Sequence, residues 1–270
     1  MGSRASAGFT IIETMLFLAV TGALMAGVLL ATSASIGVQR YRDATESFKA
    51  LIQQQYADIA SVQNTRDNVW TCDTNGAVAP GDILRGQSDC VMLGKYMTIT
   101  GGDITTYTVL AAKRATAVDT TNDITALTSN YALNIDKSRT VQESLEWDTT
   151  IAWAKEGNAN DKRSPATPRS IALLFVRSPV SGQLYTFSTN SVPTKEQLSN
   201  ATNVPTLLGA MIKAGEAVPG QQARTICLDP AGLISTPSVA LYIAPFASGA
   251  SSVEVRSNDV AGELGAEERC

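Results

Sequence analysis

Histidine is absent from this 270-residue chain, and its four cysteines include no CxxC pair. Histidine is the commonest general base and a frequent metal ligand, and the usual zinc sites combine closely spaced Cys and His. These absences exclude such zinc sites and remove the most frequent acid–base catalyst. The sequence also marks no Ser-Lys or paired-carboxylate site, so we expect neither an enzyme nor a bound cofactor.

Clustered positive charge is missing as well. The chain has 21 Lys and Arg against 25 Asp and Glu, a net charge of −4, and its cations are scattered. The densest basic spot, Lys162, Arg163 and Arg169, is better explained as a solvated loop than as a binding patch. Proteins that bind nucleic acid neutralise phosphates with clustered Lys and Arg. We therefore do not expect nucleic acid as a partner.

One long apolar run dominates the N-terminal region. The segment from Met15 to Val38 contains no charged residue and is long enough to span a bilayer. Glu13 lies at its edge, five residues after Gly8. An unpaired carboxylate is unfavourable there, so we expect a partner that compensates its charge.

Which group can compensate the charge of Glu13 depends on where the N-terminal segment is cleaved. In an ordinary secretory signal the apolar core precedes the cut and is discarded. Here Met1 to Gly8 form a short polar leader with one cation, Arg4, so a cut after Gly8 would keep the apolar segment and create an amine at Phe9. That amine could pair with Glu13 of its own chain or of a neighbour. An ion pair between two subunits would fix their register along the helix and would favour their packing.

The segment Gly8-Phe9-Thr10-Ile11-Ile12-Glu13 resembles the cleavage and N-methylation motif of type IV pilins and of the pseudopilins of type II secretion and competence systems. The resemblance implies that a prepilin peptidase cuts after Gly8 and methylates Phe9, and that Glu13 guides subunit docking. Gly22 falls where many pilins have a helix glycine, whereas Leu30 stands where many major pilins have proline. The resemblance covers roughly the first sixty residues.

Two other readings of the same segment stay open. A signal peptide cut after Ala34, where Thr32-Ser33-Ala34 offers small residues, would release a soluble protein that starts at Ser35. Alternatively, the segment is a plain single-pass anchor in which Glu13 snorkels to the interface.

Helical periodicity continues beyond Val38. Apolar residues recur at three- and four-residue spacing while charged residues fill the other positions. We therefore expect one helix from Phe9 to about Asn64, on the order of 80 Å long at 1.5 Å per residue. The recurring residues are Tyr41, Ala44, Phe48, Leu51 or Ile52, Tyr56, Ile59 and Val62.

Short β-rich segments follow the helix. Val91–Thr100 and Ile104–Ala112 around Gly101-Gly102 predict a hairpin, and Leu145–Ala154 predicts a strand with Trp147 and Trp153 in the core. Two more pairs of strands are predicted, Ile171–Arg177 with Gln183–Ser188 around the turn Pro179-Val180-Ser181-Gly182, and Arg224–Leu228 with Ser238–Ile243 joined through Asp229-Pro230-Ala231-Gly232. Other predicted elements are a short helix at Leu207–Ala214 and loops at 115–123, 157–168 and 189–205.

The predicted fold class is α+β, a long N-terminal helix packed on an antiparallel sheet. We divide the chain into a leader (1–8), a transmembrane or filament-core helix (9–38), its amphipathic continuation (39–64) and a β-rich extracytoplasmic domain (65–270). The resemblance to pilins implies the same architecture.

The cysteines are Cys72, Cys90, Cys227 and Cys270. An even number downstream of a membrane segment indicates disulfides in an oxidising compartment. Three pairings are possible. We favour Cys72 with Cys90 and Cys227 with Cys270, because each ties down a segment that otherwise ends in loop. The alternative is four buried free thiols.

Two weaker motifs were considered. Glu156, Asn158, Asn160 and Asp161 could gather oxygens around calcium, although the EF-hand spacing is absent. Gly86 to Lys95 resembles a phosphate loop, but the glycines are too far apart and Tyr96 replaces the required Ser or Thr. We expect a turn that enters a strand.

The sequence therefore predicts a structural subunit of a pilus-like or secretion filament, held in the cytoplasmic membrane by one helix and found at the cell surface after assembly. By resemblance, its size and long loops favour a minor pilin or pseudopilin over a major one. Expected partners are the prepilin peptidase, other pilin subunits, the inner-membrane assembly platform and the lipid bilayer. The alternative is a membrane-anchored or tip-located adhesin or DNA-binding module.

Overall fold

Helix α1 (Ile11–Ala60) runs without a break through the computed structural model, which describes residues 10–61, 70–73, 76–80, 90–153, 168–217, 224–230, 239–244, 247–256 and 270. Thr10 caps its first turn, because the Thr10 side chain accepts a hydrogen bond from the Glu13 N–H. No proline interrupts the segment. The predicted single helix is confirmed over these 50 residues.

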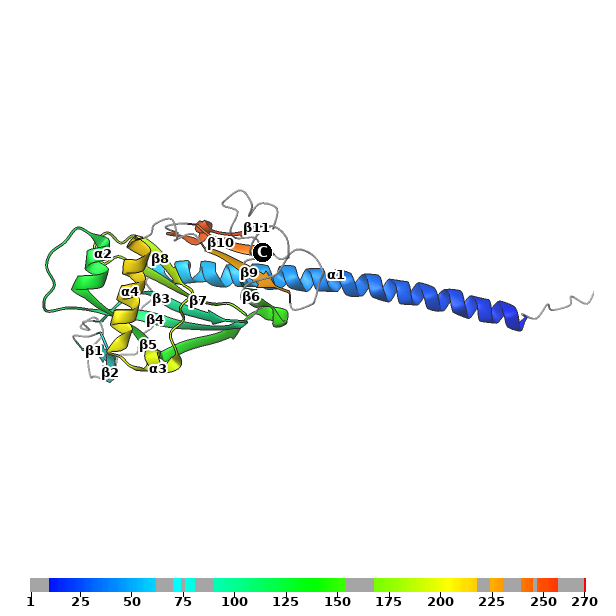
Figure 1. Ribbon diagram of the computed structural model, residues 1–270, viewed down its shortest axis with the longest axis horizontal. Coiled ribbons are helices and arrows are strands. Elements are labelled where there is room, and N and C mark those ends of the chain that lie inside the picture. The colour runs from blue at the N-terminus through cyan, green and yellow to red at the C-terminus, as the bar shows by residue number, and fades with distance from the viewer. Residues whose placement is uncertain are drawn as a thin grey trace, which may run out of the picture.

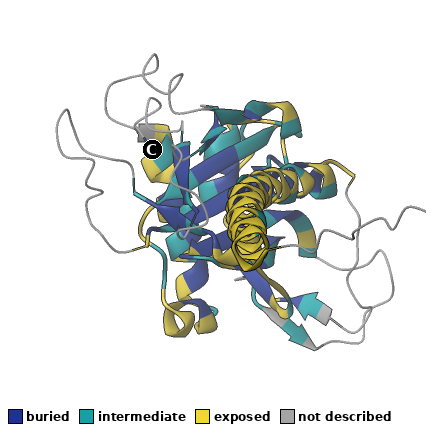
Figure 2. Cartoon of the chain, turned by 90° about the vertical axis from the view of Figure 1, so that its right-hand side faces the viewer, coloured by how far each residue is buried: buried dark blue, intermediate teal, exposed yellow. Residues whose placement is uncertain are grey.

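The two halves of α1 lie in different surroundings (Figure 1). We call Ile11 to Ile36 the stalk, because it projects away from the rest of the chain, and the described residues from 70 onward the head domain. Figure 2, viewed from the stalk side, shows the near half of the helix exposed all round. Beyond the stalk one face of α1 is buried, at the positions that the periodicity predicts: Tyr41, Ala44, Phe48, Ile52, Tyr56 and Ile59.

A five-stranded antiparallel sheet forms the centre of the head domain, in the order β5-β4-β3-β7-β8. The predicted hairpins at 91–112 and 171–188 are confirmed and lie side by side in this sheet, because β3 pairs with β7. The bounds are β3 Cys90–Thr100, β4 Asp103–Lys113, β5 Tyr131–Ser144, β7 Ser170–Arg177 and β8 Leu184–Thr189.

Two smaller sheets complete the strands. The predicted pairing of Arg224–Leu228 with Ser238–Ile243 is confirmed for β9 and β10, within a four-stranded sheet in the order β11-β10-β9-β6. The bounds are β6 Thr150–Ala152, β9 Arg224–Asp229, β10 Ala240–Ile243 and β11 Val253–Arg256, and a separate pair joins β1 Trp70–Cys72 to β2 Val78–Pro80.

Strand β7 is buried on both faces and divides the core in two. Ile171, Leu173 and Phe175 belong to a cluster with α1 and the four-stranded sheet. The alternate residues of β7 pack on the other side, against α4 (Asn203–Ala217). The remaining short elements are α2 Asp123–Thr125, the π-helix η1 Ala126–Asn130, α3 Lys195–Ser199, and the 3₁₀ turns η2 Glu146–Asp148 and η4 Ala250–Ser252. This long helix on antiparallel sheets confirms the α+β class.

Three predictions of secondary structure were wrong in part. The segment Leu145–Ala154 is not one strand, since η2 occupies its first part and, among its described residues, only Thr150–Ala152 belong to a strand. The predicted loop 189–205 contains α3, whose Thr194 and Gln197 form a capping box, and the start of α4. Helix α4 is also longer than the predicted Leu207–Ala214. The predicted loop 157–168 lies almost wholly outside the described residues.

Candidate functional site

The stalk is the largest exposed apolar surface of the described chain. Its large apolar side chains, from Ile11 to Ile36, are each at least 46% exposed. None of its most apolar 18-residue window is buried, and α1 is long and apolar enough to cross a membrane. An apolar surface of this size marks an interaction site. With the disulfide-bearing head domain, it is compatible with a single-pass membrane protein.

The threonine hydroxyls of the stalk are satisfied within the helix. The hydroxyls of Thr14, Thr21 and Thr32 donate to the carbonyl oxygens of Ile11 at 2.9 Å, Phe17 at 2.8 Å and Val28 at 2.9 Å, in that order. Such bonds to the preceding turn leave no hydroxyl to be solvated. The stalk can therefore enter hydrocarbon at these positions without unpaired donors.

Glu13 differs from the rest of the stalk. It lies in the first turn of α1, where its N–H donates to the Thr10 carbonyl at 3.1 Å and to the Thr10 hydroxyl at 3.3 Å. A carboxylate is favoured there by the helix dipole, by about 0.3–1 kcal/mol. Within the described chain, no hydrogen bond or ion pair involves the exposed Glu13 carboxylate. Gly8 and Phe9, the predicted cleavage and methylation residues, lie outside the described residues.

The head domain is hydrogen-bonded to α1 directly after the stalk. The Tyr41 hydroxyl donates to the Leu228 carbonyl at 2.9 Å and accepts from the Val239 N–H at 2.6 Å. Further along, the Tyr56 hydroxyl is bonded to that of Thr186 at 2.8 Å. These bonds tie α1 to β8, to β9 and to the chain before β10. The second half of α1 therefore shares one hydrophobic core with the head domain and is hydrogen-bonded to it.

The structure pairs the cysteines as the sequence analysis favours. Cys72 is bonded to Cys90 and Cys227 to Cys270, with Cα atoms 5.3 Å apart in each pair. The second bridge attaches the buried last residue of the chain to β9.

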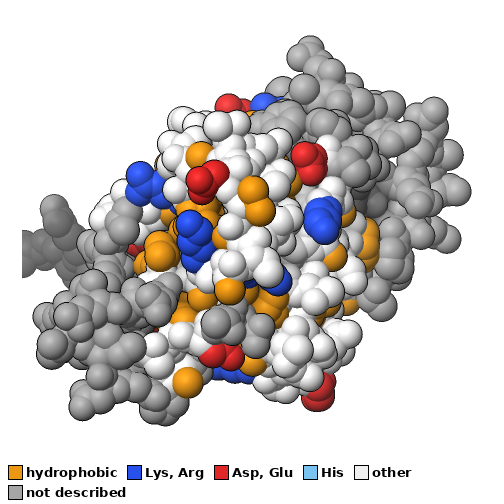
Figure 3. Space-filling view, turned by 90° about the vertical axis from the view of Figure 1, so that its left-hand side faces the viewer, with side chains coloured by type: hydrophobic (Ala, Val, Ile, Leu, Met, Phe, Trp, Pro, Cys, Tyr) orange, Lys and Arg blue, Asp and Glu red, His pale blue; other side chains and the backbone are white. Residues whose placement is uncertain are grey.

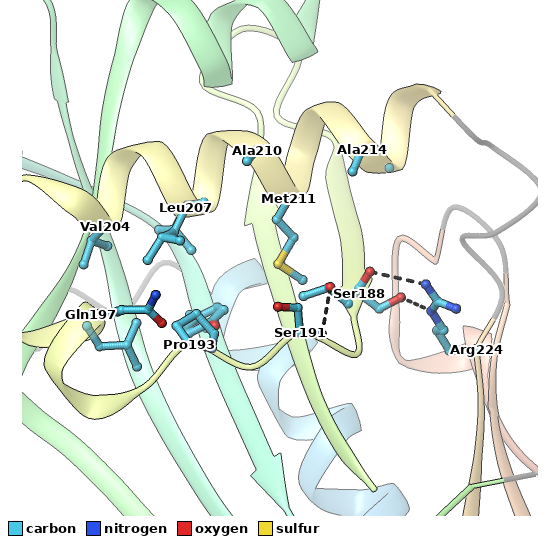
Figure 4. Close-up of a pocket in the computed structure, with 15 residues that line it drawn as sticks. Ser188, Ser191, Pro193, Gln197, Val204, Leu207, Ala210, Met211, Ala214 and Arg224 are labelled. Carbon is cyan, nitrogen blue, oxygen red and sulfur yellow. Dashed lines mark hydrogen bonds between the residues drawn. The ribbon is translucent and has the colours of Figure 1, made fainter. Parts of the chain in front are cut away.

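A cleft of about 390 Å³ lies between α4 and the segment after β8 (Figure 4). Met211 projects from α4 toward Ser191 and Pro193, which form part of the opposite wall. At one end the Arg224 guanidinium donates to the Ser188 hydroxyl at 2.5 Å. The lining residues thus combine an apolar wall with hydroxyls and one cation, and no carboxylate or histidine among them could activate a serine.

The weaker sequence motifs have different outcomes. The proposed calcium residues Glu156, Asn158, Asn160 and Asp161 lie outside the described residues. In the described ranges, no group of three or more Cys, Asp or Glu could hold a metal ion. Lys95, from the phosphate-like motif, lies in β3 and donates to the Thr108 hydroxyl at 3.2 Å. That part of the motif is a strand, as expected.

Arg169 was wrongly assigned to a solvated loop. It is 4% exposed, and its guanidinium donates to Asn190 Oδ1 at 2.8 Å and to the Thr225 carbonyl at 2.7 Å. It also lies 5.2 Å from the centre of the Trp153 ring. Arg169 is therefore a buried structural link between the two larger sheets.

Sequence reasoning missed Asp123, which holds the turn between β7 and β8. Its carboxylate accepts hydrogen bonds from the hydroxyls of Ser178 at 2.5 Å, Ser181 at 2.6 Å and Tyr185 at 2.7 Å. Desolvation alone would raise the pKa of Asp123, but these bonds together outweigh it and lower that pKa. Burial, followed by the bond to Asp123, raises the pKa of Tyr185 to about 12.

Charged side chains on the far end of the head domain are dispersed. Figure 3 shows that end, opposite the stalk, with Lys and Arg interspersed with Asp and Glu over the part of the face that is described. Nucleic-acid binding needs a basic patch, and this view shows none among the described side chains.

Comparison of the chain with protein-family models, curated proteins and solved structures gave no match.

Proposed function

We propose that this chain is a structural subunit of a helical, pilin-like filament, anchored in the membrane before assembly and held in the fibre by its stalk. The observation that carries the proposal is the stalk itself. It is a continuous apolar helix with exposed large side chains and one carboxylate in its first turn, joined by hydrogen bonds to a disulfide-bearing head domain.

The carboxylate favours assembly over simple anchoring. In hydrocarbon an ionised Glu13 needs a partner, and the described chain supplies none. The amine at Phe9 of a neighbouring subunit, created by a cut after Gly8, is the partner that we propose. Lateral packing of stalks would also bury apolar side chains from Ile11 to Ile36.

The hydrogen-bonded junction with the head domain supports the same role. Because Tyr41 and Tyr56 are hydrogen-bonded across to the sheets, the position of a docked stalk fixes the position of its head domain. The disulfides favour an extracytoplasmic head domain, since such bonds persist in oxidising compartments. We propose the prepilin peptidase, other pilin-like subunits and an inner-membrane assembly platform as partners.

A binding module at the tip of the filament is the second candidate. The cleft beside α4 favours it, since an apolar wall with one cation at its end suits a small amphipathic anion. Deletion of the protein separates the two roles. Loss of fibres indicates assembly, whereas normal fibres with lost adhesion or DNA uptake indicate binding.

The intact mass of the protein extracted from membranes tests the proposal. We expect a chain that starts at N-methylated Phe9 and carries two disulfides. A chain that starts at Ser35 would contradict the proposal, because the stalk would have been removed. A chain that starts at Met1 would indicate a plain anchor.

A further inference from the structure

The head domain covers α1 with no spacer after the stalk. Gly37 is buried and Val38 is half-buried, and Tyr41 already bonds to the head domain. Val38 is the last residue of the apolar run. If the stalk spans a bilayer, the near end of the head domain must therefore lie against the membrane surface.

Helix geometry gives the depth of that end. The stretch from Met15 to Ile36 rises about 33 Å at 1.5 Å per residue, close to the hydrocarbon thickness of about 30 Å. Arg40 follows Ile36 by about one helical turn, or about 6 Å. The headgroup region on each side is about 5–8 Å thick. Arg40 therefore lies at headgroup depth.

An exposed tryptophan lies beside Arg40. The Arg40 guanidinium is 4.6 Å from the centre of the Trp147 ring, and the Trp147 side chain is 46% exposed. Trp147 belongs to η2, the turn that follows β5 at the end of the head domain from which the stalk emerges (Figure 1). The sequence predicts a Trp147 side chain in the core, and that prediction was wrong.

The backbone holds Trp147 in an unfavourable conformation. Trp147 has φ 56° and ψ 39°, and Asp148 has φ 55°. Left-handed conformations are rare for bulky residues and are strained. They persist only where the surroundings impose them. Here the Leu145 N–H donates to the Gly102 carbonyl at 2.8 Å, and the Thr149 hydroxyl to the Glu146 carbonyl at 2.8 Å.

Charges of both signs lie around the indole. The Arg40 guanidinium contacts its ring, Asp43 is exposed about one turn further along α1, and Glu146 and Asp148 are exposed on either side of Trp147. Carboxylates beside the indole disfavour an anionic surface. A zwitterionic headgroup offers a phosphate to the arginine and an ammonium to the carboxylates. Tryptophan is enriched at this depth because its ring is apolar and its N–H is polar.

We propose that Trp147, held beside Arg40, is an interfacial anchor that seats the head domain among zwitterionic phospholipid headgroups before the subunit leaves the bilayer. This inference rests on the proposed membrane insertion of the stalk. It assigns a lipid contact to a strained turn that the proposed function does not use.

Quenching by brominated lipid tests the anchor in the full-length protein. The chain has three tryptophans, Trp70, Trp147 and Trp153. The double variant Trp70→Phe/Trp153→Phe keeps only Trp147. Its matched control is Trp147→Phe/Trp153→Phe, which keeps only Trp70 in β1, at the end of the head domain away from the stalk (Figure 1). Each is placed in phosphatidylcholine vesicles whose acyl chains carry bromine near the headgroup end, and in unbrominated vesicles.

We expect brominated lipid to remove roughly half of the Trp147 emission, since Trp147 lies at the interface, and to leave that of Trp70 nearly unchanged, because β1 lies away from the stalk. Unquenched Trp147 emission from protein that floats with the vesicles would overturn the anchor but not the membrane insertion. Protein that does not float with the vesicles would overturn both.

Two further comparisons keep the test decisive. Unquenched Trp147 emission that shifts to the blue as protein per vesicle rises would assign the surface to a neighbouring subunit and overturn the anchor. If a double variant fails to fold, the intact protein is compared with Trp147→Phe alone. Quenching must then be lost with Trp147, and equal quenching in the two proteins would overturn the proposal.

Discussion

Asp123 shows how a single carboxylate can order two distant segments. It follows a loop at 115–122, and it accepts hydrogen bonds from Ser178 and Ser181 in the turn between β7 and β8 and from Tyr185 in β8. Gly182 in the same turn has φ 76°, a conformation that favours glycine. The Asp123 carboxylate therefore stabilises a turn in which the backbone conformation at Gly182 already favours glycine.

Replacement of Asp123 by Ala should lower the free energy of unfolding by about 1–3 kcal/mol, because hydroxyl donors lose a charged acceptor. Urea unfolding of the detergent-solubilised protein measures this change. Asp119→Ala, at an exposed carboxylate in the same loop, is the matched control and should change the free energy of unfolding by less than about 0.5 kcal/mol. Equal effects of the two substitutions would contradict the role given to Asp123.

The lowered pKa of Asp123 gives this contribution a defined pH dependence. A carboxyl whose pKa is lower in the folded state than in the unfolded state stabilises the fold fully above its unfolded pKa of about 4. The contribution falls as pH drops through the folded pKa. The difference in unfolding free energy between wild type and Asp123→Ala should therefore be constant from pH 6 to 7 and shrink below about pH 4. A difference that grows on acidification would contradict this account.

Side chains whose role depends on local sequence could be predicted, and those with distant partners could not. Glu13 stands out because it borders an uncharged run. Arg169, by contrast, owes its burial to Asn190 and Thr225, and neither partner is near it in sequence. Trp147 lacks any local signal for a left-handed conformation, which is rare for such a residue.

At the scale of elements, the spacing of apolar residues and the turn residues account for the helices and strands that could be predicted. Helix α1 and the hairpins β3–β4 and β7–β8 were predicted because apolar spacing and Gly or Pro turns agree. Strand β5 was not predicted, because its C-terminal half is mostly polar and exposed. Leu145–Ala154 was mistaken for one strand, because the apolar pattern does not reveal that η2 breaks it.

Gly94 explains how β3 can pack against β7. A Cβ added at Gly94 would lie 1.9 Å from the Phe175 carbonyl oxygen, closer than any real contact. Gly94 follows the irregularity in the β3–β4 pairing. Because Gly94 has no side chain, the neighbouring strand β7 can approach the backbone of β3 closely at this point. The glycine is therefore required by the sheet and not by a ligand.

Gly94→Ala should destabilise the head domain by about 3 kcal/mol or more, since backbone must move on both strands. Gly209→Ala in α4 is the matched control, because nothing lies within 4 Å of its added Cβ. That substitution should stabilise the protein by up to about 1 kcal/mol through helix propensity. Thermal unfolding of both variants measures the contrast. Equal melting temperatures would contradict the close approach of β7.

At the scale of the whole molecule, the disulfide between Cys227 and Cys270 joins the last residue to the four-stranded sheet. It spans 43 residues, against 18 for the bridge between Cys72 and Cys90. In the chain-entropy account these loops correspond to about 4 and 3 kcal/mol of stabilisation, respectively. The pairing itself could be predicted only as the favoured choice among three.

Cys227→Ser and Cys270→Ser should therefore destabilise the protein by similar amounts, about 4 kcal/mol. The double variant should be little worse than either single variant, because both substitutions break the same bond. Denaturant unfolding without reductant measures all three. Additive effects of the two substitutions would contradict the pairing.

The whole molecule is a folded head domain on an exposed apolar helix. The apolar surface that this helix leaves exposed is the reason to expect assembly. A folded domain hides its apolar side chains, whereas the stalk hides none of its most apolar window. The sequence predicted this arrangement because the uncharged run and the amphipathic continuation have the same helical period. Which surfaces of the head domain meet in a fibre depends on contacts between subunits, and a single chain carries no periodicity that reports them.

Glu13→Ala tests the central claim most directly, with the amount of protein in sheared surface fibres and in the membrane measured for wild type and variant. Removal of the carboxylate makes insertion into hydrocarbon easier, so the membrane fraction should be equal or larger. Incorporation into fibres should fall by about tenfold, as expected for the loss of roughly 1.4 kcal/mol of docking energy per subunit. Glu13→Asp, which keeps the charge on a shorter side chain, is the matched control and should retain part of the incorporation. Normal incorporation of Glu13→Ala would contradict the account, because the carboxylate would then have no part in assembly.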